Sequence, residues 1–370
     1  MSAQRPHSPT RRHTQARDAP HEERTVAIVG ATGAVGRDLR GILAERDFPC
    51  ERLRLIASPR SAGTTLDFRG ETLTVRAVDE PDVFDGVDLA LFSAGGEVSR
   101  HHAPRAVDAG AIVVDNSSAW RMAEDVPLVV TEVNGGAVEQ LREGGRGIVA
   151  NPNCTTMVAL LPLKALHDAF GLVGFTATSY QAASGAGQAG VDEFMEQQQA
   201  LAPDPDLLDR DGDRARAKVA EPQVHADVLA FNVVPRLGGV DDEGYTDEER
   251  KLERESRKIL SLPDLAVAPT CVRVPVVTGH AVAVRAVFAD PVRSQAEAVA
   301  SMDHFPGLVV EQAPTPLAWA GRDDIAVGRV RCDLVDDHAL SFVVVGDNLR
   351  KGAALNTVQI AEELVSRGLA

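Results

Sequence analysis

Residues 25–36 read TVAIVGATGAVG and give the strongest local indication of the fold. A short apolar run typical of a buried strand ends in glycine, and a helical pattern follows over residues 34–46. Glycines at such a strand-to-helix turn allow the backbone to approach a pyrophosphate, which then lies at the helix N-terminus. Here Gly30, Gly33 and Gly36 are spaced G-x-x-G-x-x-G rather than the commoner G-x-G-x-x-G. The stretch therefore predicts a dinucleotide site, and a tight turn without ligand is the alternative.

Apolar runs and helical patterns alternate from this stretch to about residue 152. Strands that alternate with helices and end in Gly or Ser turns indicate a parallel sheet covered by helices. Long β-type runs dominate after residue 153 and suit a mostly antiparallel sheet, followed by one amphipathic helix from residue 349 to the end. The sequence therefore predicts an α/β protein with a Rossmann-type parallel-sheet domain and an α+β second domain. The expected strands are 25–30, 52–58, 87–94, 111–117, 146–152, 307–312, 325–334 and 339–346, with a helix at 97–109. Long β-type runs are expected at 174–183 and 271–288, and a turn divides the second of them into two strands.

Two segments lack this patterning. Residues 1–24 contain no Leu, Ile, Val or Phe, so they have neither the apolar core of a signal peptide nor the apolar face of a transit peptide. We expect them to form a disordered extension. Residues 201–222 are rich in Asp, Arg, Pro and Ala, and we expect a polar surface excursion there.

The composition limits the classes of partner. The net charge is −16, from 54 acidic against 38 basic residues, whereas nucleic acids and anionic membranes require a basic surface. No apolar run is long enough for a transmembrane helix. The cysteines have no C-x-x-C spacing, which favours reduced thiols in a cytoplasmic protein. They are Cys50, Cys154, Cys271 and Cys332.

The end of the second predicted strand bears on the choice of cofactor. An NAD site usually has an acidic residue there for the ribose diol. This sequence instead has Ser58, Arg60 and Ser61, and a guanidinium with two hydroxyls suits a 2′-phosphate. We therefore expect NADP rather than NAD.

Cys154 follows a strand-like run and begins a helical pattern, with Asn153 as a good N-cap. The first turn of a helix favours a thiolate, lowers the pKa of a cysteine and offers N–H groups to an oxyanion. A buried structural thiol remains the alternative, whereas zinc is disfavoured because no second Cys or His lies at ligand spacing. A thiolate beside a nicotinamide suggests addition to an aldehyde, followed by hydride loss to give a thioester.

Several charged residues are candidates for the rest of such a site. Arg273 and His280 flank a turn between two predicted strands. The arginine suits the binding of a carboxylate and the histidine suits a general acid/base. The alternative is that both are ordinary polar residues at strand ends. Glu248 and Lys251 are three residues apart on a predicted helix. Their side chains would project side by side, either into a pocket that the helix borders or from a solvated helix face. Arg121 follows the predicted strand 111–117 and is a plausible anion contact.

Taken together, these residues resemble the aspartate-β-semialdehyde dehydrogenase family from about residue 25 to the C-terminus. Each motif alone is weak, but their order is highly specific. They are GATGAVG (30–36), DNSSAWR (115–121), NPNCTT (151–156), SYQAASGAG (179–187), RVPVVTGH (273–280) and GDNLRKGAA (346–354).

The resemblance implies that Cys154 is the acylated nucleophile, His280 the acid/base catalyst and Gln181 the residue that orients the intermediate. It also implies that Arg273 holds the substrate carboxylate and Glu248 its ammonium. The implied phosphate contacts are Arg121, Asn153 and Lys251. The implied NADP site comprises Thr32, Gly33, Ala34, Val35, Arg60, Ser61, Ser184, Gly185 and Asn348, beside the motif glycines Gly30 and Gly36.

The resemblance also implies the organisation and the reaction. Residues 25–152 are expected to bind NADP, residues 153–347 to carry catalysis and dimerisation, and residues 348–370 to return to the first domain. The expected activity is NADPH-dependent conversion of L-aspartyl 4-phosphate to L-aspartate 4-semialdehyde and phosphate, in lysine, threonine and methionine biosynthesis. A homodimer is implied, and whether dimers pair into tetramers is left open. The alternatives are an N-acetyl-γ-glutamyl-phosphate reductase, which Glu248 disfavours, and a non-catalytic NADP-binding sensor.

Overall fold

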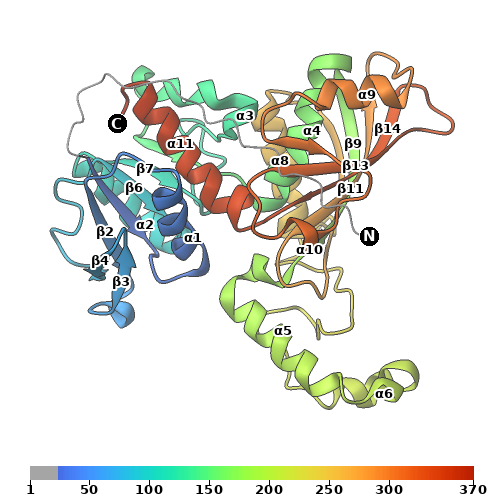
Figure 1. Ribbon diagram of the computed structural model, residues 1–370, viewed down its shortest axis with the longest axis horizontal. Helices are drawn as coiled ribbons and strands as arrows, with labels where there is room; N and C mark the ends of the chain where they lie inside the picture. Colours follow the sequence, from blue (N-terminus) through green and yellow to red (C-terminus); the bar gives the residue numbers. More distant parts are fainter. Residues whose placement is uncertain (1–23) are drawn as a thin grey trace, which may run out of the picture.

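A computed structural model describes residues 24–370. Two six-stranded sheets dominate the molecule, and the C-terminal helix α11 (Leu355–Ser366) lies between them (Figure 1). The extension predicted over residues 1–24 falls, apart from Arg24, outside the described residues.

The first sheet is parallel throughout and has the order β5-β2-β1-β6-β7-β8. The chain runs from β1 outward to β2 on one side and to β6 on the other, so the strand order reverses at β1. The crevice at the carboxyl ends of β1 and β6 is where such sheets bind ligands. The strands are β1 (Thr25–Val29), β2 (Arg52–Ala57), β5 (Arg76–Ala77), β6 (Leu89–Phe92), β7 (Ile112–Asp115) and β8 (Ile148–Ala150), and a separate hairpin comprises β3 (Thr65–Phe68) and β4 (Glu71–Thr74).

Strand β1 shows why this sheet is covered on both faces. Val26 and Ile28 join the apolar cluster formed with α1 (Ala34–Glu45) and α11, while Ala27 and Val29 join the cluster that contains α2 (Gly96–Asp108). All these side chains are buried, as expected for a parallel strand between two helical layers. The short elements η1 (Pro59–Ser61), α3 (Thr131–Asn134) and η2 (Gly135–Glu143) complete this half.

The second sheet has the order β10-β9-β11-β14-β13-β12, with antiparallel contacts in the middle and a parallel contact at each edge. One face packs against the helices α4 (Cys154–Phe170), α8 (Asp247–Leu260) and α9 (Gln295–Met302). On the other face, Thr176 and Tyr180 are exposed. The strands are β9 (Leu172–Gln181), β10 (Ala266–Arg273), β11 (His280–Phe288), β12 (Leu308–Val310), β13 (Ile325–Cys332) and β14 (Ala339–Gly346), and α10 (Pro316–Trp319) lies at one end.

The polar surface excursion predicted over residues 201–222 is confirmed, since most of its residues are exposed, but its helices were not predicted. It contains two helices, α6 (Pro205–Arg210) and α7 (Gly212–Arg216), which extend with α5 (Gly187–Leu201) away from both sheets (Figure 1). Leu201 and Ala215 pack with Phe194 in a small apolar cluster. The few apolar residues among the charges are therefore enough to fold the segment back on itself.

The single C-terminal helix predicted from residue 349 is incorrect in detail. Residues Arg350–Ala354 form a π-helical turn, η4, before α11 begins, and the residues after Ser366 are not helical. Asp347 accepts hydrogen bonds from the N–H groups of Leu349 and Arg350 and so fixes the entry to this turn. Within residues 24–370, no helix combines the length and apolar character needed to cross a bilayer.

Candidate active site

Strand register brings three of the predicted site residues together at one end of the second sheet. Arg273, the last residue of β10, is paired with Gln181, the last residue of β9. On the other side of β9, Ala281 is paired with Tyr180, which places His280 beside Gln181. All three side chains are buried. The chemistry-bearing residues are therefore fixed by the sheet rather than by flexible loops.

Cys154 reaches this cluster from the N-terminus of α4. Its Sγ lies 3.2 Å from Nε2 of His280. Asn153 caps the helix as predicted, because its side-chain oxygen accepts hydrogen bonds from the N–H groups of Thr155 and Thr156. These two N–H groups are thus not free for an oxyanion, contrary to the sequence-based expectation. The N–H of Cys154 itself is the first-turn donor that the cap does not use.

The environment of His280 determines its protonation. The backbone N–H of Ala182 donates to Nδ1 over 3.1 Å, so Nδ1 is the unprotonated nitrogen of the neutral ring. The proton is then on Nε2, which faces the sulfur of Cys154. Burial, together with Arg273, lowers the pKa of His280 to about 3. The ring is therefore neutral at physiological pH and presents an N–H to the thiol.

The predicted low pKa of Cys154 is wrong for this structure. Burial, reinforced by the nearby carboxylate of Glu248, raises the pKa of Cys154 to about 11. Arg273, Arg121 and Lys251 act in the opposite direction but do not outweigh burial. The thiol is consequently protonated at neutral pH before any ligand binds, and position at a helix terminus is not sufficient to ionise it.

Helix α8 contributes the other wall of the site. Glu248 accepts a hydrogen bond from the side-chain amide of Asn153 at 2.9 Å and pairs with Lys251 at 3.1 Å. Burial opposes its ionisation, but Lys251, Asn153 and Arg273 together lower the pKa of Glu248 to about 2. Glu248 and Lys251 therefore project side by side, as predicted. The buried carboxylate carries a negative charge at neutral pH.

Arg121 lies on the side of the site nearest the first sheet and is buried. Its guanidinium donates to Glu255 at 2.9 Å and to the carbonyl oxygens of Asn116 and Asn151, each at 2.9 Å. Because the guanidinium has five N–H groups, donors remain for an anion. The structure thus places Arg121 next to Asn153, in a fixed orientation.

Arg273 is held in a similar way, since its Nη1 donates to the carbonyl oxygen of Ala182 at 2.8 Å. A Cβ built on Gly185 would lie 2.5 Å from this nitrogen and 3.2 Å from Cε1 of His280. Gly185 therefore leaves the space between the two side chains open. A cavity of about 300 Å3 adjoins Arg273, and Arg236 and His225 also line it.

The glycine loop fits the pyrophosphate of a dinucleotide. Gly30 has a φ of +92°, and a Cβ there would lie 2.2 Å from the carbonyl oxygen of Ser93. A Cβ on Gly36 would lie 2.2 Å from the carbonyl oxygen of Gly30. No side chain caps α1, and Thr32 and Gly33 are exposed at its N-terminus. The free N–H groups of the first turn are thus open to an anion. Ala34 and Val35 form the start of this turn.

The residues expected to surround the remainder of the cofactor form two groups. Ser58 and Arg60 are exposed and Ser61 is half-buried at the end of β2, beside the glycine loop. Arg60 has no hydrogen bond or ion pair with another residue in the described range 24–370, so its guanidinium is available to a phosphate. On the second sheet, Asn348 hydrogen-bonds to Ser184 at 3.0 Å and accepts from the N–H of Gly279.

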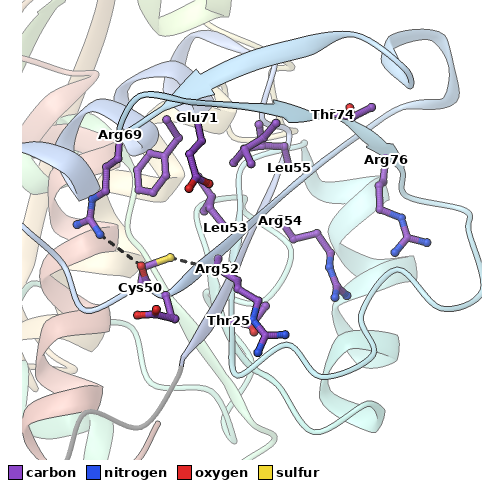
Figure 2. Close-up of a pocket in the computed structure, with 13 residues that line it drawn as sticks. Thr25, Cys50, Arg52, Leu53, Arg54, Leu55, Arg69, Glu71, Thr74 and Arg76 are labelled. Carbon is purple, nitrogen blue, oxygen red and sulfur yellow. Dashed lines mark hydrogen bonds between the residues drawn. The ribbon is translucent and has the colours of Figure 1, made fainter.

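A second cavity, of about 530 Å3, lies at the outer edge of the first sheet and contains none of the predicted site residues (Figure 2). Several arginines line it, but Arg54 and Arg69 donate to backbone carbonyls and Arg76 pairs with Glu80 and Asp82. These guanidinium groups serve to hold loops together, so the larger cavity is a structural feature of the sheet edge.

Sequence reasoning missed three residues of the site. Glu255 follows Glu248 by two helical turns and was detectable as part of the same helix face. Ala182 and Gly352 lie within the motifs SYQAASGAG and GDNLRKGAA, but the sequence assigned neither of them a role. A Cβ on Gly352 would lie 3.1 Å from the Cβ of Cys154.

Comparison with known proteins agrees with this geometry. Residues 25–141 match the family model "Semialdehyde dehydrogenase, NAD binding domain", and residues 163–351 match "Semialdehyde dehydrogenase, dimerisation domain". The aspartate-semialdehyde dehydrogenase of Corynebacterium glutamicum is 50% identical over 347 residues, covering 92% of this chain and 99% of the relative. That of Bacillus subtilis is 42% identical over 352 residues, covering 92% and 96%.

Solved structures show the same likeness. The crystal structure of aspartate semialdehyde dehydrogenase II from Vibrio cholerae, complexed with ASA, has a TM-score of 0.87 and 42% identity, and the match covers 93% of this chain and 99% of that one. The Candida albicans enzyme with NADP has a TM-score of 0.72 and 25% identity, covering 94% and 100%. By sequence and by structure, this chain belongs to the aspartate-semialdehyde dehydrogenase family.

Proposed function

We propose that this chain is an NADP-dependent aspartate-semialdehyde dehydrogenase, which reduces L-aspartyl 4-phosphate reversibly to L-aspartate 4-semialdehyde and phosphate. The observation that carries the proposal is the contact between Cys154 and His280, at 3.2 Å, within a site that also contains a buried arginine and a buried, ionised glutamate. Two Corynebacterium relatives at 50% identity carry this name, and we assign the chain to the synthesis of amino acids from aspartate.

In the proposed reaction, the sulfur of Cys154 bonds to the C4 carbonyl carbon of aspartyl phosphate. The bond from that carbon to the phosphate oxygen breaks, and the thiol proton leaves with the phosphate. Bound NADPH supplies the hydride that converts the resulting thioester to the aldehyde level. The carbon–sulfur bond then breaks, and the sulfur regains a proton. The Nε2–H of His280 contacts the sulfur, and we assign it the donation of this proton, which the ring then regains from solvent.

Substrate recognition follows from the charges of the site. We assign Arg273 to the α-carboxylate, since a guanidinium binds a carboxylate through paired hydrogen bonds. The ionised Glu248 is assigned to the α-ammonium. Arg121, Lys251 and Asn153 form the phosphate side of the site, and the amide of Gln181 orients the intermediate.

A free ammonium on the substrate separates this function from its nearest alternative. The substrate of an N-acetyl-γ-glutamyl-phosphate reductase has an acylated, uncharged nitrogen. An ionised carboxylate attracts an ammonium, but it forms no ion pair with an uncharged amide nitrogen. Glu248, with a pKa lowered to about 2, therefore supports the amino substrate.

The cofactor, NADP, is assigned to the glycine loop and to the residues around it. Gly30, Gly33 and Gly36 allow the pyrophosphate to approach the N-terminus of α1, with Thr32, Ala34 and Val35 around it. Ser58, Arg60 and Ser61 suit the 2′-phosphate. On the catalytic side, Ser184, Gly185 and Asn348 complete the proposed site. Preference for NADP over NAD rests on Arg60 and the absence of an acid at this position.

The domain matched by residues 163–351 indicates that the chain forms a homodimer with a small-molecule site in each copy. We propose a cofactor domain at 25–152, a catalytic and dimerisation domain at 153–347 and a return segment at 348–370. We further propose a cytoplasmic enzyme without a nucleic-acid partner, consistent with four free cysteines and a net charge of −16. Light scattering on the purified protein distinguishes a dimer from a tetramer of two dimers.

A kinetic comparison tests the proposed function. The purified protein is assayed for NADP reduction with L-aspartate 4-semialdehyde and inorganic phosphate, and in parallel with N-acetyl-L-glutamate 5-semialdehyde and with NAD. We expect phosphate-dependent turnover with the aspartate compound and a higher kcat/KM for NADP than for NAD. Higher kcat/KM for the acetylated compound, or no turnover with either, would refute the assignment.

A further inference from the structure

Glu255 lies on α8, two helical turns after Glu248, and is only 2% exposed. A buried glutamate is costly unless it is paired and fully hydrogen-bonded. Glu255 is both, because its two carboxylate oxygens accept from two different parts of the site. Neither contact was anticipated from the sequence, and neither partner is a neighbour in the chain.

One oxygen of Glu255 accepts from Nη1 of Arg121 at 2.9 Å, and the other accepts from the backbone N–H of Asn153 at 2.7 Å. Arg121 follows the strand β7 of the first sheet, whereas Asn153 is the residue that caps α4 and precedes the nucleophile. A single carboxylate from the second domain thus links a cation of the first sheet with the start of the catalytic helix.

Asn153 is consequently fixed from both sides by one helix. Its backbone N–H is held by Glu255, and its side-chain amide donates to Glu248 at 2.9 Å. Its remaining side-chain oxygen caps α4. These contacts fix the orientation of the residue that precedes Cys154. The same carboxylate holds Arg121, together with the carbonyl oxygens of Asn116 and Asn151.

We propose that Glu255 is a positioning residue, which sets Arg121 and Asn153 in the orientation needed to receive phosphate beside Cys154. It contacts neither the sulfur nor His280, so it acts through its two partners. Its negative charge also offsets that of Arg121, so a buried cation is maintained without a bound anion. The phosphate part of this inference rests on the proposed function, whereas the positioning of Cys154 does not.

The substitution Glu255→Gln tests the proposal with little change of shape. Glutamine has one acceptor oxygen and one amide NH2, so it can satisfy only one of the two donors. The NH2 then faces either Arg121 or the N–H of Asn153, donor against donor. Glu253→Gln is the matched control, because Glu253 is on the same helix but pairs with Arg250 and Arg257, away from the site.

Two measurements are made on each variant. In steady-state assays, the expected result for Glu255→Gln is a rise of about tenfold to a hundredfold in KM for phosphate, with KM for NADP within about twofold of wild type, as expected for loss of a charged hydrogen bond at one subsite. Glu253→Gln should match wild type. Equal rises in both KM values, accompanied by a lower melting temperature, would indicate a general structural role and overturn the proposal.

The second measurement does not require turnover. The rate at which iodoacetamide alkylates Cys154 is followed with increasing inorganic phosphate, which reports phosphate binding at the site. We expect weaker protection by phosphate and an altered alkylation rate in Glu255→Gln. Unchanged protection and rate would overturn the proposal. If wild-type protein shows phosphate protection but no turnover of aspartate semialdehyde, the proposed function fails while the role of Glu255 is still decided by this measurement.

Discussion

Gly352, in the π-helical turn η4, lies directly against Cys154: a Cβ at position 352 would be 3.1 Å from the Cβ of the cysteine and 3.5 Å from its Cα. The C-terminal segment therefore packs against the Cα and Cβ atoms of the cysteine. π-helical turns are rare and concentrate at functional sites, and this one contains the glycine that packs against the cysteine.

The substitution Gly352→Ala should displace the nucleophile. We expect kcat to fall by about tenfold or more and stability to fall by about 1–3 kcal/mol, the usual cost of overpacking. Gly136→Ala is the control, since a Cβ there would meet no atom within 4 Å. Steady-state kinetics and urea denaturation measure the two effects. Wild-type kcat in Gly352→Ala would show that the contact imposes no constraint.

The reactivity of Cys154 should depend steeply on pH in the unliganded protein. Its pKa is raised to about 11, mainly by burial, so the reactive thiolate is a small fraction at neutral pH. The alkylation rate should rise about tenfold for each pH unit between pH 7 and 10. The rate at each pH is measured by alkylation with iodoacetamide, and the Cys154→Ser variant gives the background from the other cysteines. A rate that levels off below pH 9 would mean that the thiol ionises far more readily than its burial implies.

His280 should make the protein less stable in acid. Burial lowers its pKa from 6.5 to about 3, so the unfolded state binds a proton at pH values where the folded state does not. The free energy of unfolding should therefore decrease as the pH falls from 6.5 toward 3. His102 and His225 shift in the same direction and add to the slope.

Urea denaturation of wild type and His280→Gln across this pH range isolates the contribution of His280. The variant should show a shallower decrease, because it lacks the imidazole whose pKa differs between the folded and unfolded states. Parallel curves for wild type and His280→Gln would contradict the low pKa.

The ion pair between Lys351 and Glu132 should be the most sensitive contact of the C-terminal segment. Lys351 is 1% exposed and pairs with Glu132 at 2.6 Å, with Gln359 also 2.6 Å away. Removing one partner leaves a buried charge, so Lys351→Met should cost about 3–5 kcal/mol. The double variant Lys351→Met/Glu132→Gln should recover part of this loss. Thermal and urea unfolding measure both, and equal losses in the single and double variants would exclude a charge effect.

Much of the fold could be predicted because local pattern and tertiary structure agree. The alternation around β1 indicated a buried parallel strand, and Val26 to Val29 are buried on both faces. The motif order also identified the residues that the sheet register assembles, such as Gln181 and Arg273. Their adjacency could not be derived from spacing, because it depends on the pairing of β9 with β10.

The remaining properties of the site depend on three-dimensional burial. The helix start suggested a low pKa for Cys154, but desolvation of the thiol, reinforced by Glu248, outweighs that effect and raises the pKa. The cap at Asn153 was predictable, yet its occupation of the Thr155 and Thr156 N–H groups removes the expected oxyanion donors. Likewise, the importance of Glu255 could not be predicted, because it depends on hydrogen bonds to Arg121 and Asn153, which are distant from it in the sequence.

Mass spectrometry of the trapped enzyme decides whether Cys154 forms the covalent intermediate. Protein is incubated with L-aspartate 4-semialdehyde and NADP without phosphate, quenched in acid and digested, for wild type and for Cys154→Ser. We predict an aspartyl thioester on the peptide that contains Cys154, released when phosphate is added before the quench, and no adduct in Cys154→Ser although NADP still binds. An adduct on another residue, or turnover by Cys154→Ser at the wild-type rate, would contradict the account.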